Sequence, residues 1–205
     1  MAMLNVADWV DCTEVEGPGR RFALWVQGCN ILCERCCNQD MLPFSPRRIC
    51  APNHVSRAID DAAKVHHIEG VTFLGGEPFL QARGLSIVAN HAHELGLSVM
   101  VFSGFTLKQI QKQKLPGSVE LLSHTDVLVD GPFVQSRPDP IRNWVGSTNQ
   151  KFHFLTDRYS ADIAHHHAYQ RGLEVRLRLD GAMHVNGHPS AIDRIRDFTC
   201  DNQSP

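Results

Sequence analysis

Residues 28–38 of the chain read GCNILCERCCN, and this stretch places four cysteines within nine residues. The run directly before it, residues 22–26 (FALWV), is short and apolar, as expected of a buried strand. The chain has seven cysteines, and its N-terminus lacks the pattern of a signal peptide. Because cysteines seldom form disulfides in a reducing compartment, the crowded loop indicates metal binding or catalysis.

The overall composition is that of an ordinary globular protein. With 205 residues, 42% of them hydrophobic and 20% charged, the chain can bury a sizeable core. A formal net charge of −2 gives no indication of nucleic-acid or membrane binding. No apolar run approaches the roughly 20 residues that span a bilayer. We therefore expect a cytoplasmic protein with no nucleic-acid and no membrane partner.

Short apolar runs alternate with amphipathic stretches, which is typical of repeated βα units. Strands are predicted at residues 22–26, 70–74, 98–102, 126–129 and 151–155. Helices are predicted at residues 53–64, with Asn53 as the cap, and at 82–95, 106–112 and 160–171, the last capped by Ser160. A β-hairpin is predicted at about residues 174–187, with its turn at Asp180-Gly181.

No linker divides the chain, so residues 1–205 are predicted to form one α/β domain with a parallel sheet, open or curled into part of a barrel. Functional groups in such folds gather at the carboxyl ends of the strands. Three of the predicted strands end in distinctive loops, namely GCNILCERCCN, GGEPFLQ and SGF. These loops should therefore converge on one face of the domain.

Cys29, Cys33 and Cys36 have the spacing C-x3-C-x2-C. A structural zinc site would need a fourth ligand, usually from a second Cys or His pair, and the His triplet at 165–167 does not present two ligands on one helix face. Three thiolates could instead hold three irons of an iron–sulfur cluster and leave the fourth iron open. An open position on a metal centre indicates catalysis. Cys37 should pack nearby without binding the cluster.

The C-x3-C-x2-C motif after the first predicted strand resembles the signature of the radical S-adenosylmethionine (SAM) superfamily. The lead-in at residues 16–29 (EGPGRRFALWVQGC) and the GGEP at residues 75–78 are similar to those of the small activating proteins of glycyl radical enzymes, which include the anaerobic ribonucleotide-reductase activating proteins. Residues 126–131 (DVLVDG) and 146–150 (GSTNQ) resemble later segments of the same proteins. The resemblance covers about residues 14–155 and, weakly, the terminal hairpin.

This resemblance implies a single radical SAM core domain, a partial (β/α)6 barrel with a mostly parallel curved sheet. It implies that the three spaced cysteines bind a [4Fe-4S] cluster, and that SAM chelates the fourth iron. Contacts to SAM are implied for Gly75, Gly76, Glu77, Pro78, Ser103, Gly104 and Asn38. Arg35 and Cys37 depart from the usual residues of the group. Arg35 could tune the cluster or be a solvated loop residue.

Several polar residues are open to two interpretations. Asp130 could face the site or cap a loop, while Asn149 and Gln150 are expected near the open face. Arg20 and Arg21 are expected to be a solvated charge pair at the start of a strand, although one of them could meet an acidic patch on a partner.

Three functions are compatible with the sequence. The first is a radical SAM oxidoreductase that cleaves SAM reductively to a 5′-deoxyadenosyl radical and activates a glycyl radical enzyme, with a flavodoxin- or ferredoxin-type reductant. The second uses the same chemistry on a small molecule or a ribosomal peptide. The third is a non-catalytic iron–sulfur module for electron transfer, which would not bind SAM.

Overall fold

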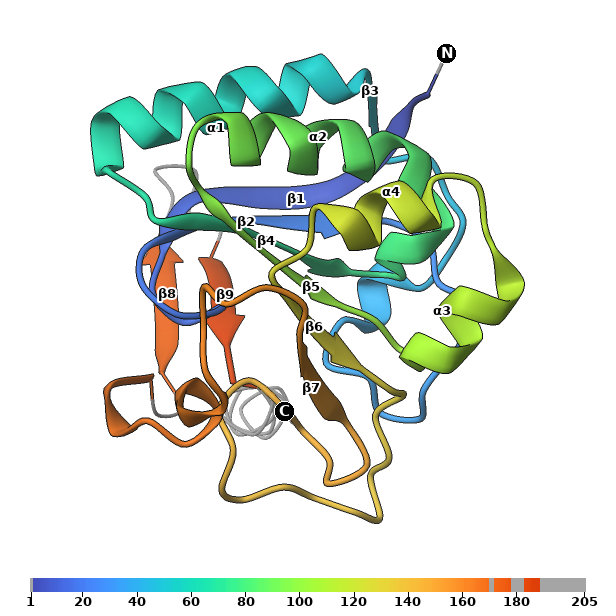
Figure 1. Ribbon diagram of the computed structural model, residues 1–205. Helices are drawn as coiled ribbons and strands as arrows, with labels where there is room; N and C mark the ends of the chain where they lie inside the picture. The colour runs from blue at the N-terminus through green and yellow to red at the C-terminus, as the bar shows by residue number, and fades with distance from the viewer. Residues whose placement is uncertain (1, 170–171, 178–182, 189–205) are drawn as a thin grey trace, which may run out of the picture.

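The structure, a computed structural model, describes residues 2–169, 172–177 and 183–188 (Figure 1). The strands are β1 (Leu4–Thr13), β2 (Arg21–Val26), β3 (Arg48–Cys50), β4 (Gly70–Gly75), β5 (Ser98–Phe102), β6 (Val127–Asp130), β7 (Lys151–Phe154), β8 (Leu173–Leu177) and β9 (Met183–Gly187). The helices are α1 (Pro52–His66), α2 (Ala82–Glu94), α3 (Leu107–Gln113) and α4 (Ser118–Ser123), with 3-10 turns η1 (Gln39–Met41), η2 (Pro78–Gln81), η3 (Ala161–Ala164) and η4 (His167–Tyr169).

A seven-stranded mixed sheet has the order β3-β1-β2-β4-β5-β6-β7, and β8 and β9 form a separate hairpin. The central strands β2, β4, β5 and β6 are parallel, which confirms the mostly parallel α/β sheet. At one side of the sheet β7 pairs antiparallel with β6, and at the other β1 pairs antiparallel with both β2 and the edge strand β3. These antiparallel edges end the βα alternation, and the sheet is open. The described residues therefore do not form the expected six-unit partial barrel.

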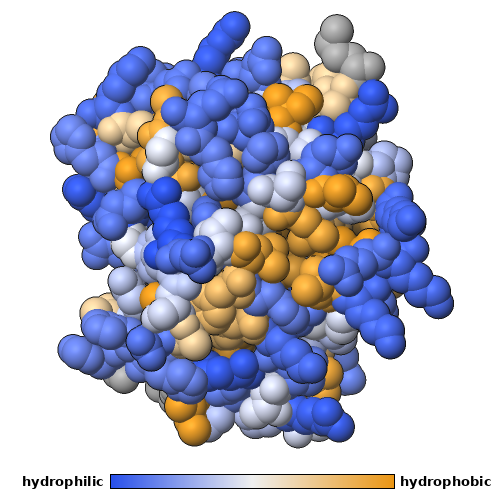
Figure 2. Space-filling model, in the orientation of Figure 1, coloured by the Kyte–Doolittle hydropathy of each residue, from blue (hydrophilic) through white to orange (hydrophobic). Residues whose placement is uncertain are grey.

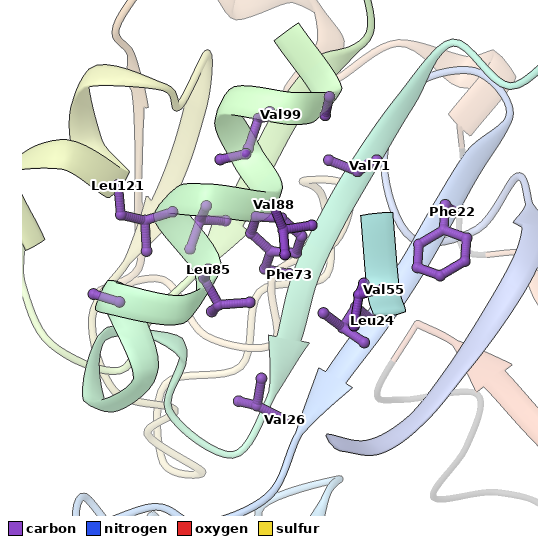
Figure 3. Packing of buried hydrophobic residues seen from close by; sticks show 14 of the residues in the cluster. Phe22, Leu24, Val26, Val55, Val71, Phe73, Leu85, Val88, Val99 and Leu121 are labelled. Carbon is purple, nitrogen blue, oxygen red and sulfur yellow. The ribbon is translucent and has the colours of Figure 1, made fainter. Parts of the chain in front are cut away.

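The main core lies between the sheet and helices α1, α2 and α4, which cover one of its faces (Figure 1). Successive strand residues point to opposite faces, so Phe22 and Leu24 of β2 pack toward the helices while Trp25 faces the other side. Figure 3 shows the helical side chains Val55 and Val88 in this cluster, beside side chains of β2 and β4. The opposite face of the sheet is left for other elements to cover.

Most of the predicted strands and helices begin and end within two residues of the observed ones. The predicted cap at Asn53 is wrong, because α1 begins at Pro52 and its cap is Ala51. Proline suits this first position, since its missing N–H would have no helical partner there. The sequence prediction missed β1, β3 and α4. In β1, charged residues interrupt the apolar alternation of an outer strand.

The predicted helix at residues 160–171 is wrong, because the described part holds only the short turns η3 and η4. Ser160 does cap η3 as predicted, accepting a hydrogen bond from Asp162 N–H. The amide of Asn143 donates to the carbonyl oxygens of Ile163 and His166, both at 2.9 Å. Because these carbonyls bind a side chain, they are not free to extend a helix.

The predicted terminal hairpin is confirmed as the antiparallel pair β8–β9. Its predicted turn at residues 180–181 lies outside the described residues.

Arg21 is fully buried at the start of β2, which corrects the expectation of a solvated charge pair. Its guanidinium donates to Thr72 Oγ1 at 2.7 Å on β4 and to Ser98 Oγ at 2.9 Å on β5. It also donates to the carbonyl oxygens of Pro18 and Val71, at 3.0 and 2.6 Å. Arg21 therefore ties together the amino ends of three parallel strands, at the end of the sheet opposite to the cysteine loop.

The surface seen in Figure 2 is mostly hydrophilic at its margins, and hydrophobic residues gather toward the middle, between α4 and β6. Of the described helices, none is long and apolar enough to cross a membrane.

We predict that Arg21→Leu lowers the free energy of unfolding by about 3 kcal/mol, because the buried hydroxyls and carbonyls lose their donor. Urea denaturation under reducing conditions would measure this change. The matched control is Arg20→Leu, at an exposed position, which should change stability by less than about 0.5 kcal/mol. Equal effects of the two substitutions would contradict the proposed role of Arg21.

Candidate functional site

A chamber of about 200 Å³ lies at the carboxyl ends of the parallel strands, on the face of the sheet away from the helices. Its apolar floor is made by Trp25 of β2, Leu74 of β4 and Phe102 of β5. The cysteine loop forms one wall, β9 and His188 form another, and the 131–150 loop contributes Gly131, Phe133, Trp144, Gly146 and Gln150. Elements that are distant in sequence therefore enclose one space.

The three loops predicted to converge do meet, and glycines permit their contact. A Cβ on Gly76 would lie 2.3 Å from the carbonyl oxygen of Gly28, and one on Gly104 would lie 2.5 Å from Cδ1 of Ile31. Gly75 has a φ of +104°, a backbone conformation that residues other than glycine rarely adopt. The GGEP and SGF loops thus each need glycine where they touch the cysteine loop.

Glu77 joins the second loop to the third. Its side chain is fully buried, and its Oε1 accepts from Ser103 Oγ–H at 2.8 Å and from Phe79 N–H at 2.9 Å. Its Oε2 accepts from Gly104 N–H at 2.8 Å. Burial raises the pKa of Glu77 to about 7, although these hydrogen bonds favour the charged form. Glu77, Ser103 and Gly104 therefore form one connected unit beside the cysteine loop.

Cys29, Cys33 and Cys36 all line the chamber. Ile31 N–H donates to Cys29 Sγ at 3.4 Å, and Asn38 N–H donates to Cys36 Sγ at the same distance. Burial raises the pKa of the Cys29 and Cys33 thiols, opposed by backbone hydrogen bonds to sulfur. Amide donors of this kind stabilise the negative charge of a thiolate that binds a metal or cluster.

Within the described ranges, no group of three or more His, Cys, Asp or Glu side chains is arranged so that it could hold a single metal ion. The fit of a multi-iron cluster therefore rests on the donor set. Three thiols on one loop face a shared chamber, and backbone N–H groups already point at their sulfurs. This donor set is the type that holds iron–sulfur clusters.

The cysteine loop contains two residues in the left-handed region, Leu32 and Arg35, each with a φ of 53°. Such values are uncommon outside glycine, and here they allow tight turns between the successive cysteines. Arg35 is exposed and lines the mouth of the chamber, and the half-buried Cys37 lines it as well. The two positions at which the sequence departs from the activating proteins it resembles thus lie at the site.

The remaining predicted residues divide between the chamber and its supports. Asn38 lines the chamber, and its amide donates to Gly75 O at 3.4 Å. Gln150 also lines the chamber. Pro78 begins η2 and is not a lining residue, and Asn149 instead donates to the carbonyl oxygen of Pro132 at 2.7 Å.

Asp130 has the capping role rather than a place in the chamber lining. It accepts from Leu107 N–H at 2.5 Å at the start of α3, and its carboxylate lies 2.9 Å from His153 Nε2. The short helix after the SGF loop is therefore anchored to the end of β6.

Sequence reasoning missed Glu16 and the contribution of the hairpin. Glu16 is buried in the chamber wall, where Asn186 Nδ2 donates to its Oε1 at 3.2 Å and to Thr13 Oγ1 at 3.0 Å. Burial raises the pKa of Glu16 to about 8. His184 also lines the chamber, and its Nδ1 lies 3.0 Å from Asp8 Oδ2. No local pattern predicts these pairs, because their members lie more than 160 residues apart.

We predict that the free energy of unfolding falls as pH rises from about 5 to about 8. Glu16 and Glu77 have folded pKa values of about 8 and about 7, above the ordinary value of 4.5. The folded chain therefore binds more protons than the unfolded chain in this range, and raising the pH favours unfolding. Each group contributes a slope of at most about 1.4 kcal/mol per pH unit. Urea titrations at several pH values would measure this fall.

In the Glu16→Gln variant, the free energy of unfolding should fall less over this pH range, above all between pH 7 and 8. The matched control is Glu120→Gln at an exposed position on α4, which should leave the slope unchanged. A stability that does not change over this pH range would contradict the assignment.

Comparison with known proteins gives the site a family. A family model described as a 4Fe-4S single cluster domain matches residues 15–153. Anaerobic ribonucleoside-triphosphate reductase-activating proteins of Salmonella typhi and Vibrio cholerae are each 30% identical to this chain, over 69% and 75% of it and 92% and 99% of their own length. The protein of the same name from Escherichia coli K12 is 28% identical, over 74% of this chain and 99% of its own length. The chain therefore belongs to the 4Fe-4S single cluster domain family and is related to the activating proteins of anaerobic ribonucleoside-triphosphate reductase.

Proposed function

We propose that this protein is a radical SAM activating enzyme for a glycyl radical enzyme. The observation that carries the proposal is the meeting of three loops at one chamber. These loops bring three cysteines with the C-x3-C-x2-C spacing, the GGEP turn and the SGF turn together. The comparisons support the proposal, because proteins named as activating proteins are 30% identical to this chain over most of their own length.

In this proposal Cys29, Cys33 and Cys36 hold a [4Fe-4S] cluster. When bound, the cluster supplies one electron for the reductive cleavage of SAM to methionine and a 5′-deoxyadenosyl radical. Amide donors to the cysteine sulfurs stabilise the charge on the thiolates. The apolar floor of Trp25 and its neighbours keeps water away from the reacting groups.

We assign the binding of SAM to Gly75, Gly76, Glu77, Pro78, Ser103, Gly104 and Asn38. The glycines leave room for backbone to approach a ligand. Glu77, whose pKa is about 7, is held in place by Ser103 and Gly104. A cationic ammonium group nearby would favour its charged form and lower its pKa. Pro78 acts less directly, by starting η2 beneath the turn.

The partner in this proposal is a protein, since the relatives are named as activating proteins of a reductase. The proposal also includes a flavodoxin- or ferredoxin-type reductant, a cytoplasmic location and one domain over residues 1–205. One observation favours a second candidate, the modification of a small molecule or ribosomal peptide. The hairpin β8–β9 lies beyond the matched residues 15–153, and its strand β9 forms part of the chamber wall.

The first test is anaerobic reconstitution with iron and sulfide, followed by SAM and dithionite. We expect 5′-deoxyadenosine and methionine from the wild-type protein, and a loss of at least about a hundredfold in Cys33→Ala, because one of three cluster ligands is missing. The matched control is Cys50→Ala on β3, away from the chamber, which should keep its product yield. A cluster that forms without any SAM cleavage would support the electron-transfer module instead.

The second test identifies the substrate class. The reconstituted protein is mixed with SAM, dithionite and the anaerobic ribonucleoside-triphosphate reductase of the same organism. We expect an organic radical signal on the reductase by electron paramagnetic resonance, and no such signal with Cys33→Ala. SAM cleavage without any radical on the reductase would favour the small-molecule or peptide candidate.

A further inference from the structure

The strand β9 lines the chamber with consecutive residues, from His184 to His188 just beyond its end. Side chains of a strand alternate between its two faces, so a run of consecutive lining residues places the edge of the strand, and not only one face, against the cavity. In the described part of the chain, β9 pairs with β8 alone. Its other edge is therefore the one that reaches the chamber.

The pairing register shows which backbone groups occupy that edge. The register pairs Leu173 with Gly187, so Gly172 lies directly opposite His188. His188 N–H donates to the carbonyl oxygen of Gly172 at 3.1 Å, which makes these two residues a hydrogen-bonded pair. Hydrogen-bonded pairs alternate with non-hydrogen-bonded pairs in an antiparallel ladder. Val185 and Val175 thus form a non-hydrogen-bonded pair, and the N–H and C=O of each point away from the other strand.

The neighbouring position on the same edge already binds a group across the chamber wall. Gly187 N–H donates to the carboxyl group of Glu16, as expected if Gly187 points outward like Val185. Within residues 2–169, 172–177 and 183–188, neither the N–H nor the C=O of Val185 forms a hydrogen bond. Its donor and acceptor are oriented as in the free edge of a sheet.

We propose that the outer edge of β9 binds an extended peptide segment of the protein partner by strand addition, through the main chain of Val185. The inference rests on the proposed function, which requires a protein segment to enter the chamber that holds the three cysteines. A strand edge offers a donor and an acceptor on one residue and repeats every second residue, a pattern that matches a peptide main chain.

The hairpin lies beyond the matched family segment, which ends at residue 153. Strand addition recognises the main chain, so this wall would hold a glycine-containing segment without requiring large side chains. The apolar floor of Trp25, Leu74 and Phe102 lies beside it. The cysteine loop lines the same chamber, so a segment held by β9 enters the space where hydrogen abstraction is proposed.

The test uses fluorescein-labelled 15-residue peptides tiled across the anaerobic ribonucleoside-triphosphate reductase of the same organism. Binding to the reconstituted protein is measured by fluorescence anisotropy. We expect at least one peptide to bind the wild type and to bind Val185→Pro about tenfold more weakly, because proline removes the outward N–H. The matched control is Val175→Pro, which removes the equivalent N–H from the opposite edge of the same hairpin and should keep wild-type affinity.

A second measurement does not depend on how the variants fold. The peptide that binds is methylated at one backbone nitrogen at a time, and strand addition predicts that binding is lost at every second position. Equal affinity of the two proline variants together with uniform tolerance of methylation would overturn the inference, as would the absence of any binding peptide. Concentration-dependent dimerisation that Val185→Pro abolishes would also overturn it, since the edge would then serve a second copy of the chain.

These outcomes are separate from those of the proposed function. If the protein cleaves SAM and forms a radical on the reductase, but Val185→Pro does not change peptide binding, only the proposed role of β9 is wrong. Failure of the wild-type protein to cleave SAM would remove the proposed function itself.

Discussion

The contact between Gly28 and Gly76 is the constraint on which the rest of the site depends. The ends of β2 and β4 lie side by side in a parallel register, so the loops that follow them leave the sheet at the same level. A Cβ on Gly76 would lie well inside contact distance of the Gly28 carbonyl oxygen. Glu77 N–H donates to the Gly28 carbonyl oxygen at 2.9 Å, so the start of the cysteine loop is held against the GGEP turn. The cysteine loop then meets Gly104 through Ile31.

Polar groups buried at the two ends of the parallel strands hold this arrangement in register. At the amino ends, Arg21 bonds to side chains of β4 and β5. At the carboxyl ends, Glu77 bonds to the loop after β5. A buried ionisable group is costly unless it is hydrogen-bonded, so both positions favour one arrangement of the strands over alternatives. The energetic cost of burial at Glu77 is visible as its raised pKa.

The sequence predicted the parts of the fold that depend on local pattern. Apolar runs gave the central strands, and the ends of those strands indicated where the cysteine, GGEP and SGF loops would meet. It did not predict the buried position of Arg21, because a charge pair beside a strand looks the same whether it is solvated or buried. It also missed Glu16 and Asn186, whose contact joins segments 170 residues apart. The helix expected at residues 160–171 failed because Asn143, from another segment, binds its carbonyl groups.

The hairpin also has a consequence for the order in which the molecule is assembled. Its bonds to β1 close very long loops, such as the one between Thr13 and Glu174, which are separated by 161 residues. The entropic cost of closing a loop rises with its length, and contacts of long sequence separation slow folding. The sheet, whose strands are near neighbours in sequence, can form while this wall is still open. In that order of folding the thiols are gathered before the wall covers them, and iron and sulfide would have their widest access to the thiols before the hairpin docks.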